Sequence, residues 1–453
     1  AVMIGTTHFT NAVVQRRGLT PVAAVRIGLP ASASLEPFVD WPPELARIVD
    51  GGHYMVEGGH EYDGRPIVPF AAAKMRRVAR QIRDSGVRAV GIASVFSPLN
   101  PACEEAAAEI LREECPDVAI TLSHELGRLG LLERENVTLL NAALIELARR
   151  TTAAYLHALE DSGVRAPLYL TQNDGTITRA ELAAELPVYS FASGPTNSMR
   201  GAAFLSRIED AIVVDVGGTT SDIGALRHGF PREANNVVEV GGVRTNFRMP
   251  DVLSIALGGG TIVHRGTPLG VGPDSVGYEI TRRALVFGGD ELTCTDVAVA
   301  AGLIELGDPG RARPLGRALV DDCLASVQGM IDEAVDRMKP DANPLPLIAV
   351  GGGSFLIPER LAGIAEVVNV EHRAVANAVG AAIAQVSGEV DQIFRDLSRD
   401  EAIERAREQA EERAVRAGAD PATLKVVEVE DLPIAYLPGN ALRTRVRVVG
   451  DIA

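Results

Sequence analysis

The first part of the chain alternates short apolar runs with segments of helical periodicity. Residues 22–28 form a β-branched apolar run that predicts a strand, and 89–95 repeat the pattern after a basic stretch at 71–85 that predicts a helix. The same pattern predicts further helices over 101–114 and 141–163 and strands over 118–122 and 167–171. Strands separated by helices of this length imply a largely parallel sheet.

The pattern changes at the turn-rich junction Phe191-Ala-Ser-Gly-Pro-Thr196, where we place a domain boundary. Beyond it we predict helices over 199–205 and 315–339, strands over 211–216 and 347–350, a long charged helix over 391–417, and a hairpin over 424–449 turning at Pro438-Gly-Asn440. The expected domains are therefore 1–191, 192–390 and 391–453.

Composition narrows the class of protein. The chain has 453 residues, 46% of them hydrophobic and 23% charged, with a net charge of −16. An acidic chain without a cluster of Lys and Arg argues against nucleic-acid binding. No apolar run is long enough to span a membrane, and the four cysteines form no C-x-x-C pair. We expect a cytoplasmic α/β protein.

The strongest local motif is Ile212-Val-Val-Asp215-Val-Gly-Gly218-Thr-Thr-Ser-Asp222. A buried strand delivers Asp215, and Gly217 and Gly218 allow a tight turn. The hydroxyls of Thr219 and Thr220 and the successive N–H groups can then surround a phosphate. Carboxylates repel phosphate, so Asp215 and Asp222 suit Mg²⁺ or a bridging water. A glycine-rich hairpin turn without function is the alternative.

A second glycine turn, Gly351-Gly352-Gly353, follows the predicted strand at 347–350. Glycine lets the sugar and α-phosphate of a nucleotide approach the backbone closely. Such turns are common between strands and helices, so the motif gains weight from its position after the Asp215 loop, as in a two-lobed ATPase.

These two motifs resemble those of the actin/hexokinase/heat-shock-chaperone ATPases. More narrowly, the chain is similar to the hydantoinase/oxoprolinase family, on the side of its ATP-binding hydantoinase A subunit. Stretches spread over most of the chain carry the resemblance: Gly5–Ala12, Gln172–Thr176, Ala192–Thr196, the Asp215 loop, Val240–Asn246, Pro250–Ile255, Gly258–Gly260, Gly272–Gly277 and Thr293–Asp296. The resemblance implies a two-domain actin-like (ribonuclease H-like) fold with mixed sheets flanked by helices.

The sequence departs from that family at its start. Members normally open with a first Asp-x-Gly-Gly-Thr loop on a hairpin before the Gly-Thr-Thr-x-x-x-Asn segment, and this loop is not in the sequence. The expectation is that the opening piece is cleaved, unresolved or deleted, which would leave half of the phosphate cradle missing.

The resemblance implies ATP-dependent opening of a cyclic amide such as a hydantoin or 5-oxoproline, with Mg²⁺ and a second subunit of the hydantoinase B type. It assigns phosphate to Gly217, Gly218, Thr219 and Thr220, Mg²⁺ to Asp215 with Asp222, and the nucleoside to Gly351, Gly352 and Gly353. The apolar face of the predicted helix at 391–417 favours a homo-oligomer.

Further candidates carry open alternatives. Asn173 and Asp174 lie on a turn after a strand, where they would orient water or substrate, or form an Asx-turn. Thr6, Thr7 and Asn11 would contact substrate or phosphate, or cap a helix. Substrate-binding roles are also assigned to Asp251 and Gly259.

His53 and His60 are seven residues apart and suggest a Zn²⁺ or Mn²⁺ site, but they lie in a turn-rich stretch that favours a surface loop or lid.

Four other functions stay open at this point. One is an ATP-using ketone carboxylase subunit, and another is a small-molecule kinase of the same fold. A third is a nucleotide-gated interaction protein without enzymatic activity, and the last is an inactive truncated form.

Overall fold

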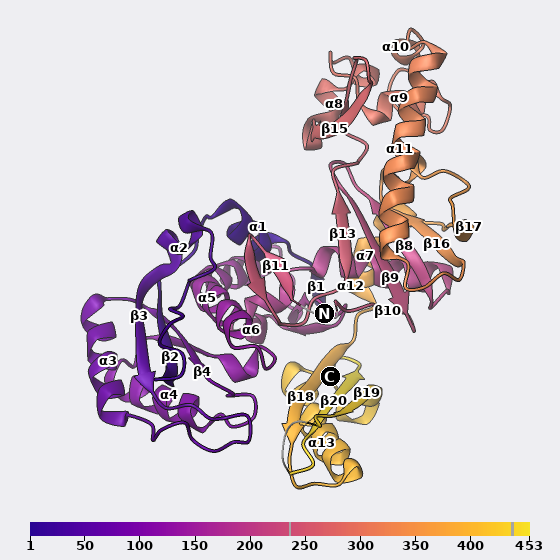
Figure 1. Ribbon diagram of the computed structural model, residues 1–453. Coiled ribbons are helices and arrows are strands. Elements are labelled where there is room, and N and C mark those ends of the chain that lie inside the picture. Colours follow the sequence, from indigo (N-terminus) through magenta and orange to yellow (C-terminus); the bar gives the residue numbers. More distant parts are fainter. Residues whose placement is uncertain (235–236, 436–438) are drawn as a thin grey trace. The chain divides into compact units, whose positions relative to one another are not determined.

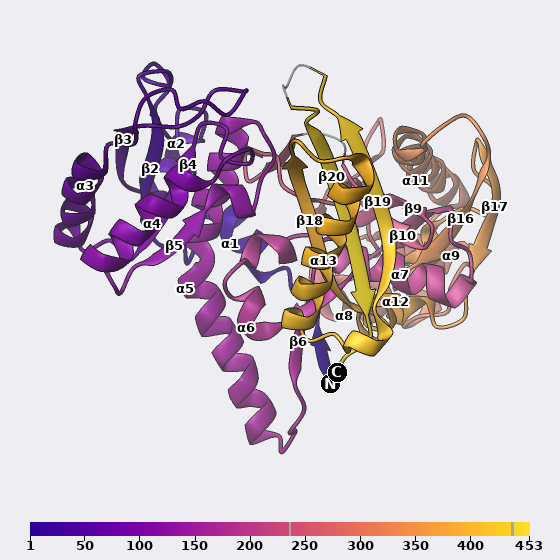
Figure 2. The ribbon, with the colours of Figure 1, turned by 90° about the horizontal axis from the view of Figure 1, so that it is seen from below.

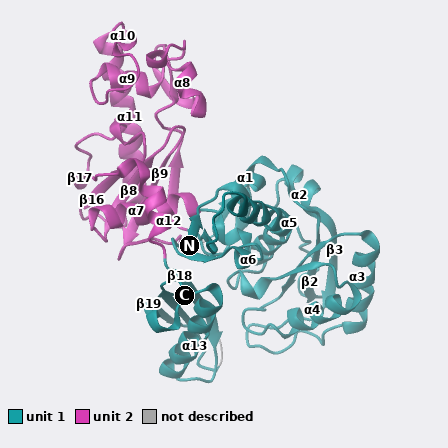
Figure 3. Ribbon diagram, turned by 180° about the vertical axis from the view of Figure 1, so that it is seen from behind, with its two compact units in different colours: residues 1–192, 235–249, 385–453 teal, residues 193–234, 250–384 magenta. Residues whose placement is uncertain are grey.

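The computed structural model describes residues 1–234, 237–435 and 439–453, which form two compact units. Unit 1 comprises residues 1–192, 235–249 and 385–453, and unit 2 comprises 193–234 and 250–384 (Figure 3).

Unit 1 contains a four-stranded parallel sheet in the order β3-β2-β4-β5 (Figure 1). Its central strand β2 is buried along nearly its whole length, and alternate residues point to opposite faces. Ala23, Val25 and Ile27 pack with α3 and α4, whereas Val22 and Ala24 pack with α1, α2 and α5. The bounds are α1 (His8–Gln15), β2 (Val22–Leu29), α2 (Pro43–Val49), β3 (Asp50–Glu57), α3 (Ala72–Ser85), β4 (Ala89–Ser94), α4 (Ala102–Glu114), β5 (Ala119–Leu122) and α5 (Leu131–Asp161).

A second sheet of unit 1 joins the two ends of the described chain, in the order β1-β6-β7-β18-β20-β19. Helix α13 (Arg399–Ala417) covers it, as Figure 2 shows, through the buried residues Ala402, Ala406, Ala410 and Ala414. The strands are β1 (Val2–Ile4), β6 (Leu168–Thr171), β7 (Ile177–Arg179), β18 (Val386–Phe394), β19 (Lys425–Pro433) and β20 (Leu442–Gly450), and α6 (Ala180–Ala183) and the hairpin β11 (Val238–Val240) with β12 (Val243–Thr245) complete the unit.

Unit 2 is built on one mixed sheet in the order β10-β9-β8-β16-β17, with β13 also paired to β9. Strand β9 runs antiparallel to both β10 and β8, whereas β8, β16 and β17 run parallel to one another. The bounds are α7 (Ser193–Ser206), β8 (Ala211–Val216), β9 (Ser221–Arg227), β10 (Phe230–Pro231), β13 (Val252–Ile255), α11 (Arg317–Met338), β16 (Leu345–Val350), β17 (Ile364–Asn369) and α12 (Ala376–Ala382).

This strand order and its mixture of directions are those of the ribonuclease H-like sheet of actin-type ATPases, which confirms the expected fold class. Helices α7 and α12 pack on one face of the sheet and α11 on the other. The rest of unit 2 includes β14 (Thr261–His264), β15 (Gly270–Ser275), α8 (Ile280–Arg283), α9 (Cys294–Ala300) and α10 (Pro309–Ala312).

Most predicted elements are present, but three helix starts were wrong. Helix α7 begins at Ser193, six residues before the predicted start at 199. Helix α5 begins at Leu131, ten residues before the predicted start. The predicted helix over 391–417 begins only at Arg399, where Ser398 and Glu401 form a capping box, and its first residues belong to strand β18. The predicted hairpin is confirmed as antiparallel β19 and β20, while Pro438 in its turn lies outside the described residues.

Candidate functional site

Three glycine-containing loops of unit 2 meet at the carboxyl end of strand β8. The turn 217–220 joins β8 to β9, and the turn 258–260 packs against its backbone: Gly259 N donates to Gly217 O at 3.0 Å and Gly260 N to Gly218 O at 2.7 Å. From the third loop, Gly353 N donates to Val216 O at 2.8 Å. The structure thus brings together Gly217, Gly218, Gly259 and the 351–353 turn.

At two positions in these loops, Gly258 and Gly351, there is no room for a side chain. A Cβ on Gly258 would lie 2.6 Å from Thr219 N, and one on Gly351 would lie 2.2 Å from Asp215 Oδ1. Gly351 also has a φ of +88°, a conformation that favours glycine. Gly352, by contrast, has open space around its Cβ position. Glycine is therefore required where the loops touch, and space remains at Gly352.

The 217–220 turn presents donors to solvent. Gly218, Thr219 and Thr220 are exposed, and within the described part of the chain the amides of Gly218 and Thr219 and the hydroxyls of Thr219 and Thr220 have no hydrogen-bond partner. Two amides and two hydroxyls on one short turn are chemically suited to bind the oxygens of a phosphate.

Two carboxylates lie beside this turn in one row across the sheet. Asp215 on β8 pairs with Asp222 on β9, and Asp222 pairs with Ser254 on β13, so the three side chains share one face. Ser254 donates a hydrogen bond to Asp222. In the described chain no Lys, Arg or His forms an ion pair with either carboxylate.

Burial raises the pKa of Asp215, and burial together with the charge of Asp215 raises the pKa of Asp222. A pair of carboxylates that lacks a cationic side chain and repels itself is a favourable place for a cation. Since Mg²⁺ keeps several waters and binds through one or two carboxylates, these residues fit the ion, with phosphate oxygens completing its shell.

Two candidate residues of unit 1, Asn173 and Asp174, already form hydrogen bonds within their own unit. Asn173 is buried, accepts from Ala192 N at 2.8 Å, and donates to Val188 O and Arg248 O at 3.0 and 3.1 Å. Asp174 Oδ1 accepts from Thr176 N at 3.0 Å, which makes an Asx-turn, and Arg248 Nη1 lies 3.4 Å from Asp174 Oδ2.

The start of α1 holds the other unit 1 candidates. Thr6 Oγ1 accepts from His8 N at 3.1 Å, and Asn11 Nδ2 donates to Thr7 Oγ1 at 3.3 Å. Thr7 is the N-cap residue of α1, and its side chain makes no capping hydrogen bond. In unit 2, Asp251 precedes β13 at its end away from the 217–220 turn and accepts from Arg232 Nη2 at 2.6 Å.

Among the described residues, His53 and His60 do not belong to a cluster of metal ligands. His53 Nδ1 lies 3.4 Å from Asp50, and His60 is buried. Over residues 1–234, 237–435 and 439–453, no three His, Cys, Asp or Glu side chains lie close enough together to hold a metal ion.

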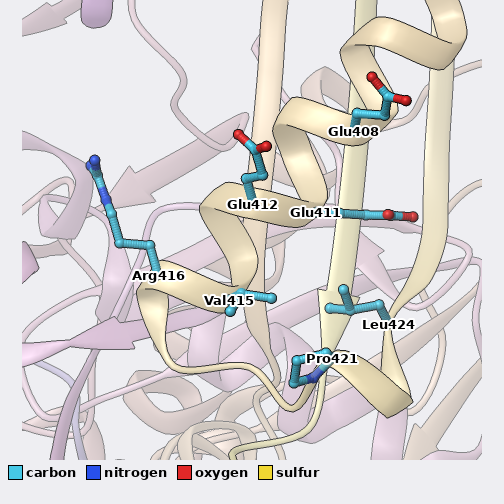
Figure 4. A pocket seen from close by; sticks show the side chains of 7 residues that line it. All are labelled: Glu408, Glu411, Glu412, Val415, Arg416, Pro421 and Leu424. Atoms are coloured by element: carbon cyan, nitrogen blue, oxygen red, sulfur yellow. The ribbon is translucent and has the colours of Figure 1, made fainter.

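Sequence reasoning missed Ser254, which donates to Asp222, because the two residues are 32 positions apart. It also missed a hollow of about 860 Å³ on unit 1, lined by residues of α13 and the segment after it (Figure 4). Glu408, Glu411 and Glu412 make this hollow strongly acidic.

Sequence comparison shows the family. The profile of the hydantoinase/oxoprolinase N-terminal region matches residues 1–115, and that of hydantoinase/oxoprolinase matches residues 134–309, which contain the 217–220 turn, Asp215 and Asp222. The chain belongs to the hydantoinase/oxoprolinase family.

Curated relatives are distant and longer. The chain is 25% identical over 359 residues to the caprolactamase subunit alpha of Pseudomonas jessenii, covering 74% of this chain and 50% of the relative. It is 27% identical over 253 residues to the acetophenone carboxylase gamma subunit of Aromatoleum aromaticum, covering 53% and 34%. The chain thus spans half or less of the length of these relatives.

Two solved structures share the fold over 99% of this chain. The ATP-dependent caprolactamase from Pseudomonas jessenii has a TM-score of 0.77 at 20% identity and is covered over 78% of its chain. Nucleotide-free acetone carboxylase has a TM-score of 0.67 at 17% identity and is covered over 79%.

Among the described helices none combines the length and the apolar character needed to cross a bilayer.

Proposed function

We propose that this chain is the ATP-binding subunit of an enzyme that opens a cyclic amide. The observation that carries the proposal is the site in unit 2. Among the described residues, the amides and hydroxyls of its exposed turn have no hydrogen-bond partner, and the two adjoining half-buried carboxylates have no cationic partner. Such a site is suited to Mg²⁺ and a nucleoside polyphosphate. The relationship to an ATP-dependent caprolactamase supports a lactam as the substrate class.

The chemistry follows from the poor reactivity of an unstrained amide. Transfer of the γ-phosphoryl group of ATP to the amide oxygen would release ADP and give an O-phosphorylated imidate. Water would then add to its carbon, and cleavage of the ring C–N bond in this adduct, with a proton taken up by the nitrogen, would give an open-chain amino acyl phosphate. A second water would attack the acyl carbon, and phosphate would leave with its bonding electrons to give the open-chain amino acid.

In this proposal the phosphate turn and the carboxylates of unit 2 supply positioning and charge neutralisation. Gly218, Thr219 and Thr220 would hold the terminal phosphates, and Asp215 and Asp222 would hold Mg²⁺ directly or through water. Mg²⁺, when bound, neutralises charge on the phosphate oxygens. Gly351, Gly352 and Gly353 would lie against the nucleoside.

Asn173, Asp174, Thr6, Thr7, Asn11 and Asp251 remain proposed substrate or water contacts. Because Asn173 and Asp174 are held by bonds to their own unit, we propose that they shape the turn on which substrate rests. A second subunit of the hydantoinase B type is proposed because two of the relatives are themselves named as subunits.

The specific alternative is a ketone carboxylase subunit, which the relationships to acetophenone carboxylase and acetone carboxylase favour. In that reaction ATP would activate oxygen on the ketone or on bicarbonate instead of on an amide. The same phosphate site serves either chemistry, so the substrate has to be determined directly.

The test is Mg²⁺-dependent ADP release measured over hydantoins, 5-oxoproline, caprolactam and other lactams, and ketones with bicarbonate. Each assay is run with and without a hydantoinase B-type partner. We expect one ring compound to stimulate ADP release and to appear as its ring-opened product. Stimulation only by a ketone with bicarbonate would contradict the lactam proposal and establish the carboxylase instead.

A further inference from the structure

Between β15 and α8, which are both labelled in Figure 1, a short segment of unit 2 contacts the 217–220 turn. Ser275 Oγ donates to Gly218 O at 3.3 Å. Gly277 has a φ of +52°, a conformation that favours glycine, and its Cβ position lies 3.7 Å from Thr219 Oγ1. These contacts hold the backbone of the segment beside Gly218 and Thr219.

The next residue, Tyr278, projects from this segment into solvent. It belongs to a single 3₁₀ turn, Gly277–Glu279, and its side chain has no hydrogen bond or ring contact within the described residues. The guanidinium of Arg283 bonds to Glu279 and Glu291 and not to the tyrosine.

The exposure of Tyr278 is unusual for this chain. It is 94% exposed, whereas the other exposed large hydrophobic residues in the described part of the chain are 38–59% exposed. A single apolar side chain on a surface is ordinary in itself. The position decides here, because the exposed ring follows directly on a backbone segment that contacts the 217–220 turn, where it is available to a ligand bound at that turn.

The third glycine loop contacts the other part of the same turn. Gly353 N donates to Val216 O at 2.8 Å, and its Cβ position lies 2.8 Å from Gly217 O. In the proposed function the nucleoside lies against this third loop, so the phosphates extend along the turn from Gly217 toward Thr219. The terminal phosphate, and the acceptor to which it is transferred, then lie on the side of Tyr278.

We infer that Tyr278 binds the lactam acceptor by packing its ring against the apolar carbons of the lactam ring. This inference rests on the proposed function, to which it adds a substrate contact. An aromatic side chain offers a large apolar surface at a small conformational cost, because only two torsions have to be fixed. The methylene carbons of a lactam ring match such a surface, whereas the base of the nucleotide belongs at the third loop.

The test separates binding of the lactam from binding of the nucleotide. For Tyr278→Ala and Tyr278→Phe, ADP release is measured against the concentration of the ring compound that stimulates the wild-type enzyme. Mg²⁺–ATP is saturating and the hydantoinase B-type partner is present, and the Kd of Mg²⁺–ATP is measured separately by calorimetry. Phe204→Ala is the matched control, because Phe204 is an exposed aromatic residue of unit 2 on α7, outside the loops at the 217–220 turn.

We expect Tyr278→Ala to raise the KM for the ring compound roughly tenfold, the scale expected when one aromatic ring no longer shields apolar surface from water. The kcat should be unchanged, because the contact is present in the bound substrate and in the transition state alike. Tyr278→Phe keeps the ring and should keep the wild-type KM. The Kd of Mg²⁺–ATP, the melting temperature and the Phe204→Ala control should stay at the wild-type values.

An unchanged KM in Tyr278→Ala would overturn the inference. So would a weakened Kd of Mg²⁺–ATP with an unchanged KM, since the ring would then contact the nucleotide. An equal rise of KM in Tyr278→Phe would assign the contact to the hydroxyl and contradict ring packing. If no ring compound stimulates the wild-type enzyme, the proposed function itself fails and the inference fails with it. That outcome is distinct from a stimulated wild type with an unaffected Tyr278→Ala.

Discussion

At the residue scale, the site depends on positions that have no side chain, such as Gly258 and Gly351, as much as on its polar side chains. Asp215, Gly217 and Thr219 were identifiable from sequence because strand β8 and the 217–220 turn form one contiguous motif. Gly351 was identifiable as a glycine turn, but its closeness to Asp215 was not, since 136 positions separate them. Ser254 carries no local signal, because its contact with Asp222 arises from the register between β13 and β9.

The two neighbouring glycines of the third loop should respond differently to alanine. Gly351→Ala places a Cβ 2.2 Å from Asp215 Oδ1 and 2.4 Å from Val216 O at a φ of +88°, so we expect a loss of more than about 2 kcal/mol of stability. Gly352→Ala meets no atom within 4 Å and should stay within about 0.5 kcal/mol of wild type. Urea unfolding measures both, and equal stabilities would show that the loop does not approach Asp215 as described.

At the scale of elements, strands and long amphipathic helices were predictable because their periodicity is local. Helix α13 was misjudged at its start. Residues 391–394 mix charged and apolar side chains in a way that suits a helix. They belong instead to β18, which pairs with β20, and Asp391 forms an ion pair with Arg443. Tertiary pairing thus overrides local propensity there. The capping box at Ser398 and Glu401 marks the true start and was present in the sequence.

A buried charge pair joins α4 to the loop after β5 and should make unit 1 sensitive to pH. Glu104 is fully buried and accepts from Ser94 N at 2.8 Å and from His124 Nδ1 at 2.7 Å. Burial opposes both charges, but the hydrogen bond and charge of Glu104 outweigh it and raise the pKa of His124. His124 and Arg134 likewise outweigh burial and lower the pKa of Glu104.

The signs of these shifts define two pH windows. The raised pKa of His124 gives stability that is complete below about pH 6.5 and is lost as pH rises through its folded pKa. The lowered pKa of Glu104 gives stability that is present above about pH 4.5 and is lost as pH falls through its folded pKa. We expect His124→Gln to remove the loss of stability that accompanies rising pH. The free energy of unfolding, measured with urea between pH 6 and 9, checks this. An identical decline in both proteins would exclude His124 as its source.

At the scale of the whole molecule, the chain passes between its two units four times. Residues 235–249 follow a strand-rich part of unit 2, yet they belong to unit 1. There Asn246 Nδ2 donates to Gly130 O at 3.1 Å and Asn136 Nδ2 donates to Arg244 O at 2.9 Å. These bonds span more than 100 positions, so no local pattern announces them. The family resemblance was visible because its motifs are short and lie in order along the chain.

The central claim is that the 217–220 turn of unit 2 binds the phosphates of Mg²⁺–ATP. Its most direct test is calorimetric titration of Mg²⁺–ATP into wild-type protein and the Thr219→Ala, Thr220→Ala double variant, with urea unfolding as the control for the fold. Both threonines are exposed, so stability should be unchanged. Loss of two hydroxyl contacts to a charged phosphate should weaken binding by about tenfold or more. Wild-type affinity in the double variant would contradict this placement of the site.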